Sequence, residues 1–170
     1  ASLAALEIDP LDFWARNELF FLNSESGMEL KMPEGWLAAE SKMGNIVQNY
    51  LAMAVDYGRS GFWEDAAETL SRLIKSRREN VTTYPLLYYY LGYFLEKSGD
   101  SQGALQYYRQ AGNLSPYYCF PFRLESIDVL RAALKRNPSD ARAHYYLGNL
   151  LFPLQPEEAI KEWEKAAKID

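Results

Sequence analysis

A four-residue motif, Tyr-Tyr-Leu-Gly, occurs twice in this chain, at residues 89–92 and again at 145–148. Around the first copy, apolar residues recur at spacings of three and four, which predicts one buried stripe of an α-helix. Gly99 ends this stretch, and Asp100 can cap a second helix that stops at residues 115–116. Two amphipathic helices joined by a short glycine turn form an antiparallel hairpin. The recurrence therefore predicts an array of helix pairs and an all-α fold.

The spacing inside the first hairpin matches a known repeat signature of 34 residues, here counted from Pro85. The signature positions fall on Tyr88, Leu91, Gly92, Leu95, Ala104, Tyr108, Ala111 and Pro116. On these residues the chain resembles the tetratricopeptide repeat family. The resemblance implies a right-handed α-solenoid of antiparallel helix pairs. In such a pair Gly92 and the alanines let the helices approach closely, while larger residues fill the gaps beside them.

We expect the whole chain to be one solenoid segment excised from a longer protein. The expected parts are the tail of a preceding repeat at 1–12, an irregular repeat at 13–46, repeats at 47–80 and 85–118, a half repeat at 119–140 and a truncated last repeat at 141–170. The half repeat follows because Pro138 comes only 22 residues after Pro116, and Pro121 prevents a helix between them at its position. In the irregular repeat a helix is expected to resume near Trp36.

One face of the first helix in each pair is expected to line the concave groove, as it does in the family. The predicted partner-binding residues on or beside this face are Tyr89, Tyr90, Tyr93, Arg142, Tyr145, Tyr146 and Asn149. Tyrosine is a common interface anchor because it combines a large rigid ring with a hydroxyl group. In the alternative interpretation, several of these rings pack against the neighbouring repeat. The clamp of lysines and asparagines with which some family members hold chaperone tails is absent, since only Asn149 matches it.

Composition and motif content argue against several other classes of protein. The formal net charge of −5 argues against a duplex nucleic-acid partner, and no apolar run reaches the roughly 18 residues of a membrane span. Cys119 and His144 are too few for a disulfide or a zinc site, and no glycine-rich phosphate loop is present. We therefore expect no metal, no cofactor and no catalytic residue. His144 occupies a packing position with no obvious carboxylate partner, and the glutamates at 157, 158, 162 and 164 are predicted to form a solvated helix face.

These features predict a non-enzymatic scaffold that binds a protein, or a neighbouring domain of the same polypeptide, through a tyrosine-rich groove. An alternative is a carbohydrate-contacting region of a multidomain protein. It comes from a second resemblance, carried by Pro10 to Leu22 and Ser115 to Glu125, to the repeat region of large bacterial proteins that have a mutarotase-like β-sandwich before the helices. Self-association through exposed solenoid ends is a third possibility.

Overall fold

The computed structural model describes residues 1–10, 12–26, 46–75 and 84–170. The helix expected near Trp36 and the end of the expected repeat at 47–80 lie outside these ranges. The chain divides into two compact units, Ala1–Ile46 and Val47–Asp170. The described residues contain helices and no strand, which confirms the all-α class.

Two helices are described in the N-terminal unit, α1 (Ser2–Ile8) and α2 (Phe13–Ser26). Leu6 of α1 packs with Ala15 and Leu19 of α2 in a small apolar core. The carboxylate of Asp12 accepts a hydrogen bond from the backbone N–H of Ala15 at 3.0 Å, which caps α2.

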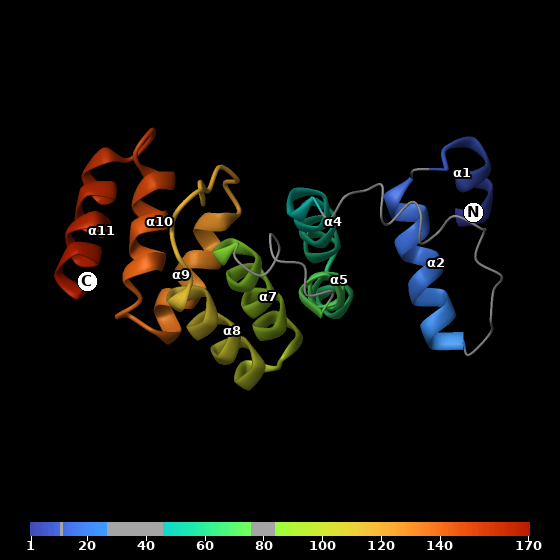
Figure 1. The fold of residues 1–170 in the computed structure, drawn as a ribbon, viewed down its shortest axis with the longest axis horizontal. Helices are drawn as coiled ribbons and strands as arrows, with labels where there is room; N and C mark the ends of the chain where they lie inside the picture. Colours follow the sequence, from blue (N-terminus) through green and yellow to red (C-terminus); the bar gives the residue numbers. More distant parts are fainter. Residues whose placement is uncertain (11, 27–45, 76–83) are drawn as a thin grey trace. The chain divides into compact units, whose positions relative to one another are not determined.

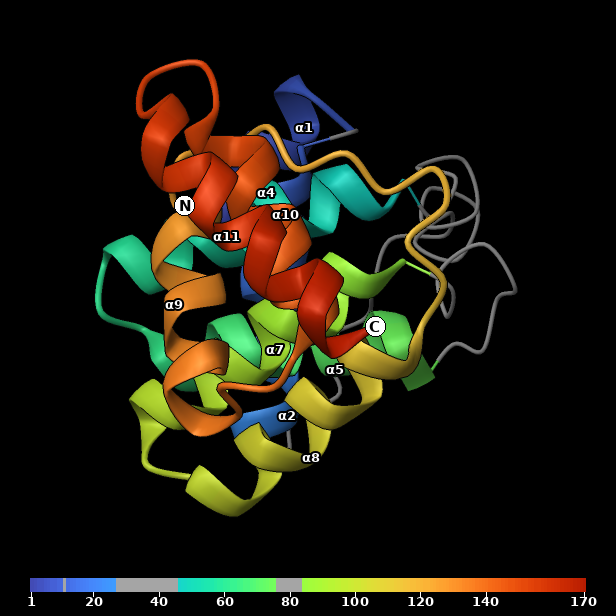
Figure 2. The same ribbon diagram turned by 90° about the vertical axis from the view of Figure 1, so that its left-hand side faces the viewer.

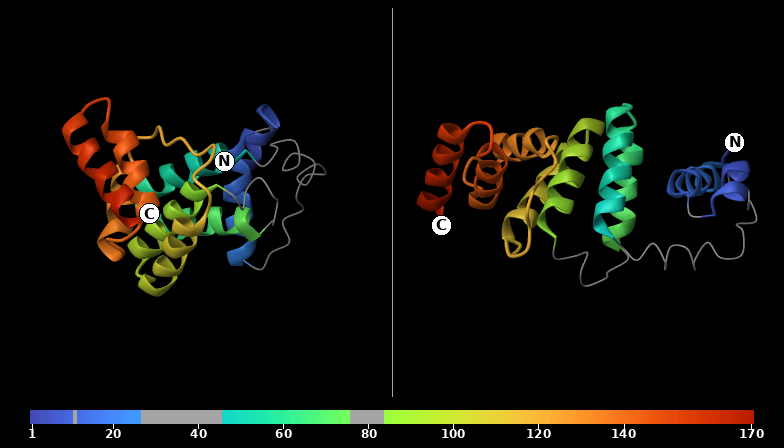
Figure 3. Two further views of the ribbon diagram at one scale, coloured as in Figure 1. Left: turned by 60° about the vertical axis from the view of Figure 1, so that its left-hand side comes forward. Right: turned by 90° about the horizontal axis from the view of Figure 1, so that it is seen from above.

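The C-terminal unit consists of helix pairs that follow one another along the chain (Figures 1 and 3). The helices are α4 (Val47–Arg59), α5 (Trp63–Lys75), α7 (Pro85–Ser98), α8 (Ser101–Asn113), α9 (Ser126–Arg136), α10 (Ala141–Leu151) and α11 (Pro156–Ile169). The pairs α4–α5, α7–α8 and α10–α11 make the most extensive contacts, and α5 also packs against α7. The unit is a helical-repeat solenoid, as the sequence predicts.

The turn between α7 and α8 has the predicted geometry. Gly99 adopts φ of 100°, a left-handed conformation that glycine reaches without steric cost, and the N–H of Asp100 donates to the carbonyl of Leu95 at 2.8 Å. The carboxylate of Asp100 then accepts from the N–H of Gly103, also at 2.8 Å, and caps α8. One short segment thus ends one helix and starts the next.

Close approach of α7 and α8 depends on Gly92. A Cβ atom at this position would lie 2.7 Å from two ring carbons of Tyr108 and 3.1 Å from the backbone oxygen of Ala104. The structure therefore confirms that the missing side chain at Gly92 lets the paired helices meet.

Residues 114–125 connect α8 to α9 without a helix, and Tyr118 within them has φ of 60°. Figure 2 shows this segment as a yellow to orange trace between the end of α8 and the start of α9. Cys119 in its middle is 2% exposed. Its thiol lies beside the side chains of Tyr84 and Tyr146 and the backbone of Leu86. Cys119 therefore holds the segment against α7 and α10.

Candidate partner-binding surface

Three of the predicted groove tyrosines belong to the core. Tyr89, Tyr90 and Tyr146 have exposed fractions of 0%, 1% and 0%. The rings of Tyr89 and Tyr146 meet edge to face with centroids 6.2 Å apart. The expectation that these three side chains face a partner is therefore corrected in favour of the packing alternative.

The cause of this burial is the connection at 114–125 together with the start of α9 and α10. Cys119 lies against Tyr146, and the hydroxyl of Tyr90 shares a 2.7 Å hydrogen bond with Ser126 at the start of α9. The hydroxyl of Tyr89 reaches Asp140, the N-cap residue of α10, at 3.0 Å from both carboxylate oxygens. Cys119, Ser126 and Asp140 thus contact the tyrosines that were expected to face the groove.

Burial raises the pKa of both members of the pair formed by Tyr89 and Asp140. Burial raises the pKa of Asp140, while hydrogen bonds from the N–H of Ala143 and from Tyr89 act in the opposite direction. Burial, followed by the charge of Asp140, raises the pKa of Tyr89. The hydroxyl of Tyr89 therefore stays protonated and donates to Asp140. This hydrogen bond joins α7 to α10.

Four of the predicted residues keep some exposure to solvent, and three of them lie on α10. Arg142, Tyr145 and Asn149 line one cleft of about 520 Å³ together with residues of α11. The other lining residues include Trp163, Ala166 and Ala167 of α11 and its C-cap residue, Asp170. We call this surface the α10–α11 cleft.

Polar contacts fix both walls of the α10–α11 cleft. The guanidinium of Arg142 lies 3.3 Å from the carboxylate of Asp170, and the indole N–H of Trp163 donates to the side-chain oxygen of Asn149 at 3.1 Å. Tyr145 is 41% exposed between them. The sequence analysis did not name Trp163 as a partner-binding residue. Its contact with Asn149 joins two helices, so the spacing within one helix does not reveal it.

Tyr93, the remaining predicted residue, is not part of this cleft. It lines a second cavity with Trp63 and Phe94, between other helices of the unit. The predicted groove is thus divided into two separate surfaces.

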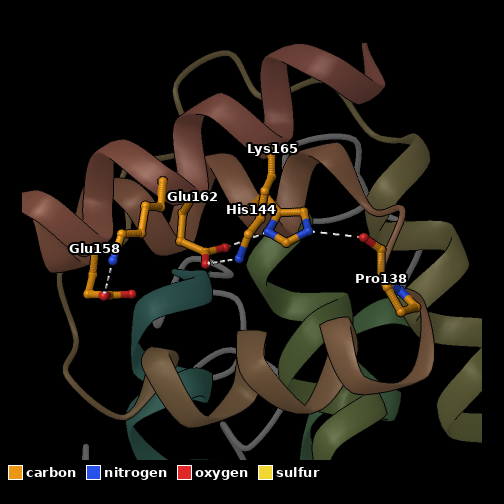
Figure 4. A network of polar contacts seen from close by, with 6 residues as sticks. Pro138, His144, Glu158, Glu162 and Lys165 are labelled. Atoms are coloured by element: carbon orange, nitrogen blue, oxygen red, sulfur yellow. Dashed lines mark hydrogen bonds and ion pairs between the residues drawn. The ribbon is translucent and has the colours of Figure 1, made fainter.

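His144 forms a buried polar network that joins α10 to α11 (Figure 4). Its Nδ1 lies 2.5 Å from a carboxylate oxygen of Glu162, and its Nε2 lies 3.0 Å from the carbonyl oxygen of Pro138. Lys165 donates to the other oxygen of Glu162 at 2.6 Å. Both ring nitrogens of the imidazole therefore face a hydrogen-bond acceptor within the fold.

Glu162 is therefore not part of a solvated face. It is 8% exposed, because its place on α11 faces α10, and it is the carboxylate partner of His144 that the sequence did not reveal. Burial alone raises its pKa, but hydrogen bonds from Lys165 and His144 outweigh this and hold the pKa below the ordinary value of 4.5. The network has the character of a structural link between helices.

Neither a metal centre nor a membrane span is found in the described part of the chain. No group of three or more histidine, cysteine, aspartate or glutamate side chains is arranged there to hold a metal ion. None of the described helices is long and apolar enough to cross a bilayer.

The fold and the paired-helix surfaces define a helical-repeat protein. The family model described as tetratricopeptide repeat matches residues 51–117 and 124–170, and the chain belongs to this family. Proteins of the family generally serve as non-catalytic scaffolds for protein–protein contacts, and this chain is a helical-repeat interaction scaffold.

Two solved structures are similar to this chain. The crystal structure of MamA is 21% identical, with 80% of this chain and 87% of that chain covered and a TM-score of 0.38. The crystal structure of YrrB, described as a TPR protein with an unusual peptide-binding site, is also 21% identical, with 100% and 92% covered and a TM-score of 0.37. A search of curated proteins found no match.

Proposed function

We propose that this chain is a non-enzymatic scaffold that binds a partner protein, or a neighbouring domain of its own polypeptide, at the α10–α11 cleft. A difference in exposure between equivalent repeat positions carries the proposal. Leu51 and Tyr145 are each the fifth residue of their repeat, yet Leu51 is 1% exposed and Tyr145 is 41% exposed. In the first case α7 packs against α4 and α5. Among the described helices, none packs over the α10–α11 cleft in this way.

The side chains of the cleft indicate what the partner offers. Tyr145 and Trp163 provide two aromatic anchors, which favours a helix with an apolar stripe. Arg142 already holds a carboxylate, that of Asp170, whose side chain is 67% exposed and free to yield to another acid. We therefore expect a partner helix with an acidic residue next to its apolar stripe.

The absence of enzymatic activity is supported by what the two most reactive side chains do. Both ring nitrogens of His144 are occupied by acceptors within the fold. Cys119 is buried, and burial raises the pKa of its thiol, which disfavours the nucleophilic thiolate. Each residue thus has a packing role that accounts for its place.

A photo-crosslinking amino acid at position 145 tests the proposal in extracts of the source cells. We expect one dominant protein adduct from position 145 and none from position 118, whose tyrosine is 91% exposed outside the cleft. With the captured partner in hand, Tyr145→Ala and Trp163→Ala should each weaken binding about 30-fold, as aromatic anchors do. Equal adducts at positions 145 and 118, or unchanged affinity in both variants, would contradict the proposal.

The two other hypotheses from the sequence make different predictions at the same surface. Stacking on a carbohydrate needs exposed ring faces, and the burial of three tyrosines leaves Tyr145 and the half-buried Trp163 to supply them. Glycan-array binding that is lost in Tyr145→Ala would favour that hypothesis over a protein partner. A dimer in solution that dissociates in the same variant would favour self-association.

A further inference from the structure

A second cavity, of about 230 Å³, lies where α4, α5, α7 and α9 meet. Its aromatic lining consists of the partly exposed rings of Trp63 and Tyr93 and the buried rings of Phe94 and Tyr90. Two carboxylate residues of the α9 region, Glu125 and Asp128, also line it. We call this cavity the aromatic–acidic pocket. It shares no residue with the α10–α11 cleft.

The three aromatic rings form a connected wall. Trp63 and Tyr93 meet edge to face with centroids 6.3 Å apart and planes at 86°, and Tyr93 meets Phe94 at 5.9 Å and 62°. Gly58 makes this arrangement possible, because a Cβ atom there would lie 2.8 Å from the ring of Phe94 and 3.1 Å from that of Trp63. The wall therefore depends on a position without a side chain.

A cation of the protein already lies over this wall. The Nζ atom of Lys97 is 5.3 Å from the ring centroid of Tyr93 and 5.9 Å from that of Trp63. Both distances are within the range of about 6 Å in which an ammonium group is attracted to the negative face of a ring. Lys97 does not line the cavity itself. The rings thus attract an ammonium group in the protein as it stands.

One carboxylate on the acidic side of the pocket is not neutralised by a cationic side chain of the described residues. Asp128 is exposed on the first turn of α9 and forms no hydrogen bond or ion pair with the residues that the structure describes. Glu125 is 3.6 Å from Arg59 and 3.8 Å from Arg123. Arg59 is the one cationic side chain among those lining the pocket, and with 66% of its side chain exposed it can turn into solvent. An incoming cation would meet Asp128 without breaking an existing pair.

We propose that the aromatic–acidic pocket binds the alkylammonium group of a lysine or methylated lysine side chain presented by a partner. Aromatic faces stabilise the positive charge, and Asp128 neutralises it at the rim. The same carboxylates repel an anion, and a neutral aliphatic group of the same shape gains only the apolar contact. The site lies outside the proposed helix-binding cleft, so its failure would leave the proposed function unchanged.

Choline and its neutral isostere 3,3-dimethyl-1-butanol separate charge recognition from apolar contact, because they have the same shape. The indole N–H signal of Trp63, assigned by its loss in Trp63→Phe, reports binding in a two-dimensional NMR titration of the whole chain. We expect choline to shift this signal at millimolar concentration and the neutral isostere to bind about fivefold more weakly. Equal binding of the two probes, or no shift at Trp63 with choline, would overturn the proposal.

Two variants that each remove one negative charge test whether Asp128 itself contributes to choline binding. Asp128→Asn should weaken choline binding about threefold, whereas Glu64→Gln, an exposed acid outside the pocket, should leave it unchanged. Equal losses in both variants would mean that only net charge matters. Both positions are exposed, so the variants should fold, and circular dichroism checks this.

The source of the ammonium group is decided by a third probe, N-acetyl-trimethyllysine amide. A side-chain ligand predicts that this probe binds at least as tightly as choline, since its backbone and stem can add contacts. Weaker binding than choline would overturn assignment to a partner side chain and leave a free quaternary ammonium compound as the ligand.

Discussion

The hydrogen-bonded pair of Tyr89 and Asp140 makes a quantitative prediction about what holds α10 to α7. Replacing Asp140 by alanine removes the N-cap of α10, whose carboxylate accepts from the N–H of Ala143 at 3.0 Å. Loss of such a cap costs about 1 kcal/mol. The same change leaves the fully buried hydroxyl of Tyr89 without its acceptor, which costs about 1 to 3 kcal/mol.

A smaller effect acts in the opposite direction. Burial raises the pKa of Asp140, which shows that its charge is costly to desolvate, and alanine removes that cost. We therefore expect Asp140→Ala to lower the free energy of unfolding by about 2 kcal/mol. Urea denaturation followed by circular dichroism measures this value.

Asp100→Ala is a matched control. Asp100 caps α8 through the N–H of Gly103 but is exposed and has no tyrosine partner, so its loss should cost only about 1 kcal/mol. The double-mutant cycle of Asp140→Ala with Tyr89→Phe should give a coupling energy of about 1 kcal/mol, because Phe has no hydroxyl group that could lose its hydrogen-bond acceptor. Equal costs for the two aspartate variants, together with a coupling near zero, would refute the role assigned to the buried pair.

Three further predictions concern other parts of the C-terminal unit. Gly92→Ala should destabilise the protein by about 1 to 2 kcal/mol in urea denaturation, since its Cβ atom would meet the ring of Tyr108 at 2.7 Å. A stabilised variant would contradict the close approach of α7 and α8 at this position. Because the pKa of Glu162 is lowered in the folded protein, its contribution to stability is present above pH 4.5 and is lost as the pH falls through the folded pKa. Glu162→Gln should remove this part of the acid dependence, which thermal unfolding at a series of pH values measures. An unchanged pH profile in this variant would count against the His144 network. Cys119 should react with a thiol reagent far more slowly in the native protein than in urea, and a native rate equal to the denatured one would show that residues 114–125 do not cover α7.

Much of the fold was readable from local spacing. The signature around Gly92 places small residues where two helices meet, and the left-handed Gly99 with the cap at Asp100 defines the turn between them. These features depend on residues within one hairpin, so periodicity and turn chemistry suffice to predict them. The lack of a helix around Pro121 was also foreseeable, because proline interrupts the segment before α9.

The candidate site was only partly predictable. Arg142, Tyr145 and Asn149 lie together on one cleft because helical geometry alone puts them on one face of α10. Tyr93 was expected beside them, yet it faces a separate cavity with Trp63, which comes from another repeat. Glu162 was assigned to solvent, although it is the buried partner of His144 on the adjacent helix. These errors share one origin, since contacts between elements are not encoded in the spacing within an element.

The Tyr-Tyr-Leu-Gly motif separates what the local sequence determines from what only the tertiary structure decides. Its Leu and Gly residues pack between paired helices in both copies, as the repeat pattern requires. The first tyrosine of the motif differs in burial between the two copies, since Tyr89 is fully buried against Asp140 while Tyr145 remains 41% exposed. The local sequence is the same, so the difference arises from a neighbour distant in the chain. Residues that return over α7 cover one ring, and nothing in the described structure covers the other in the same way.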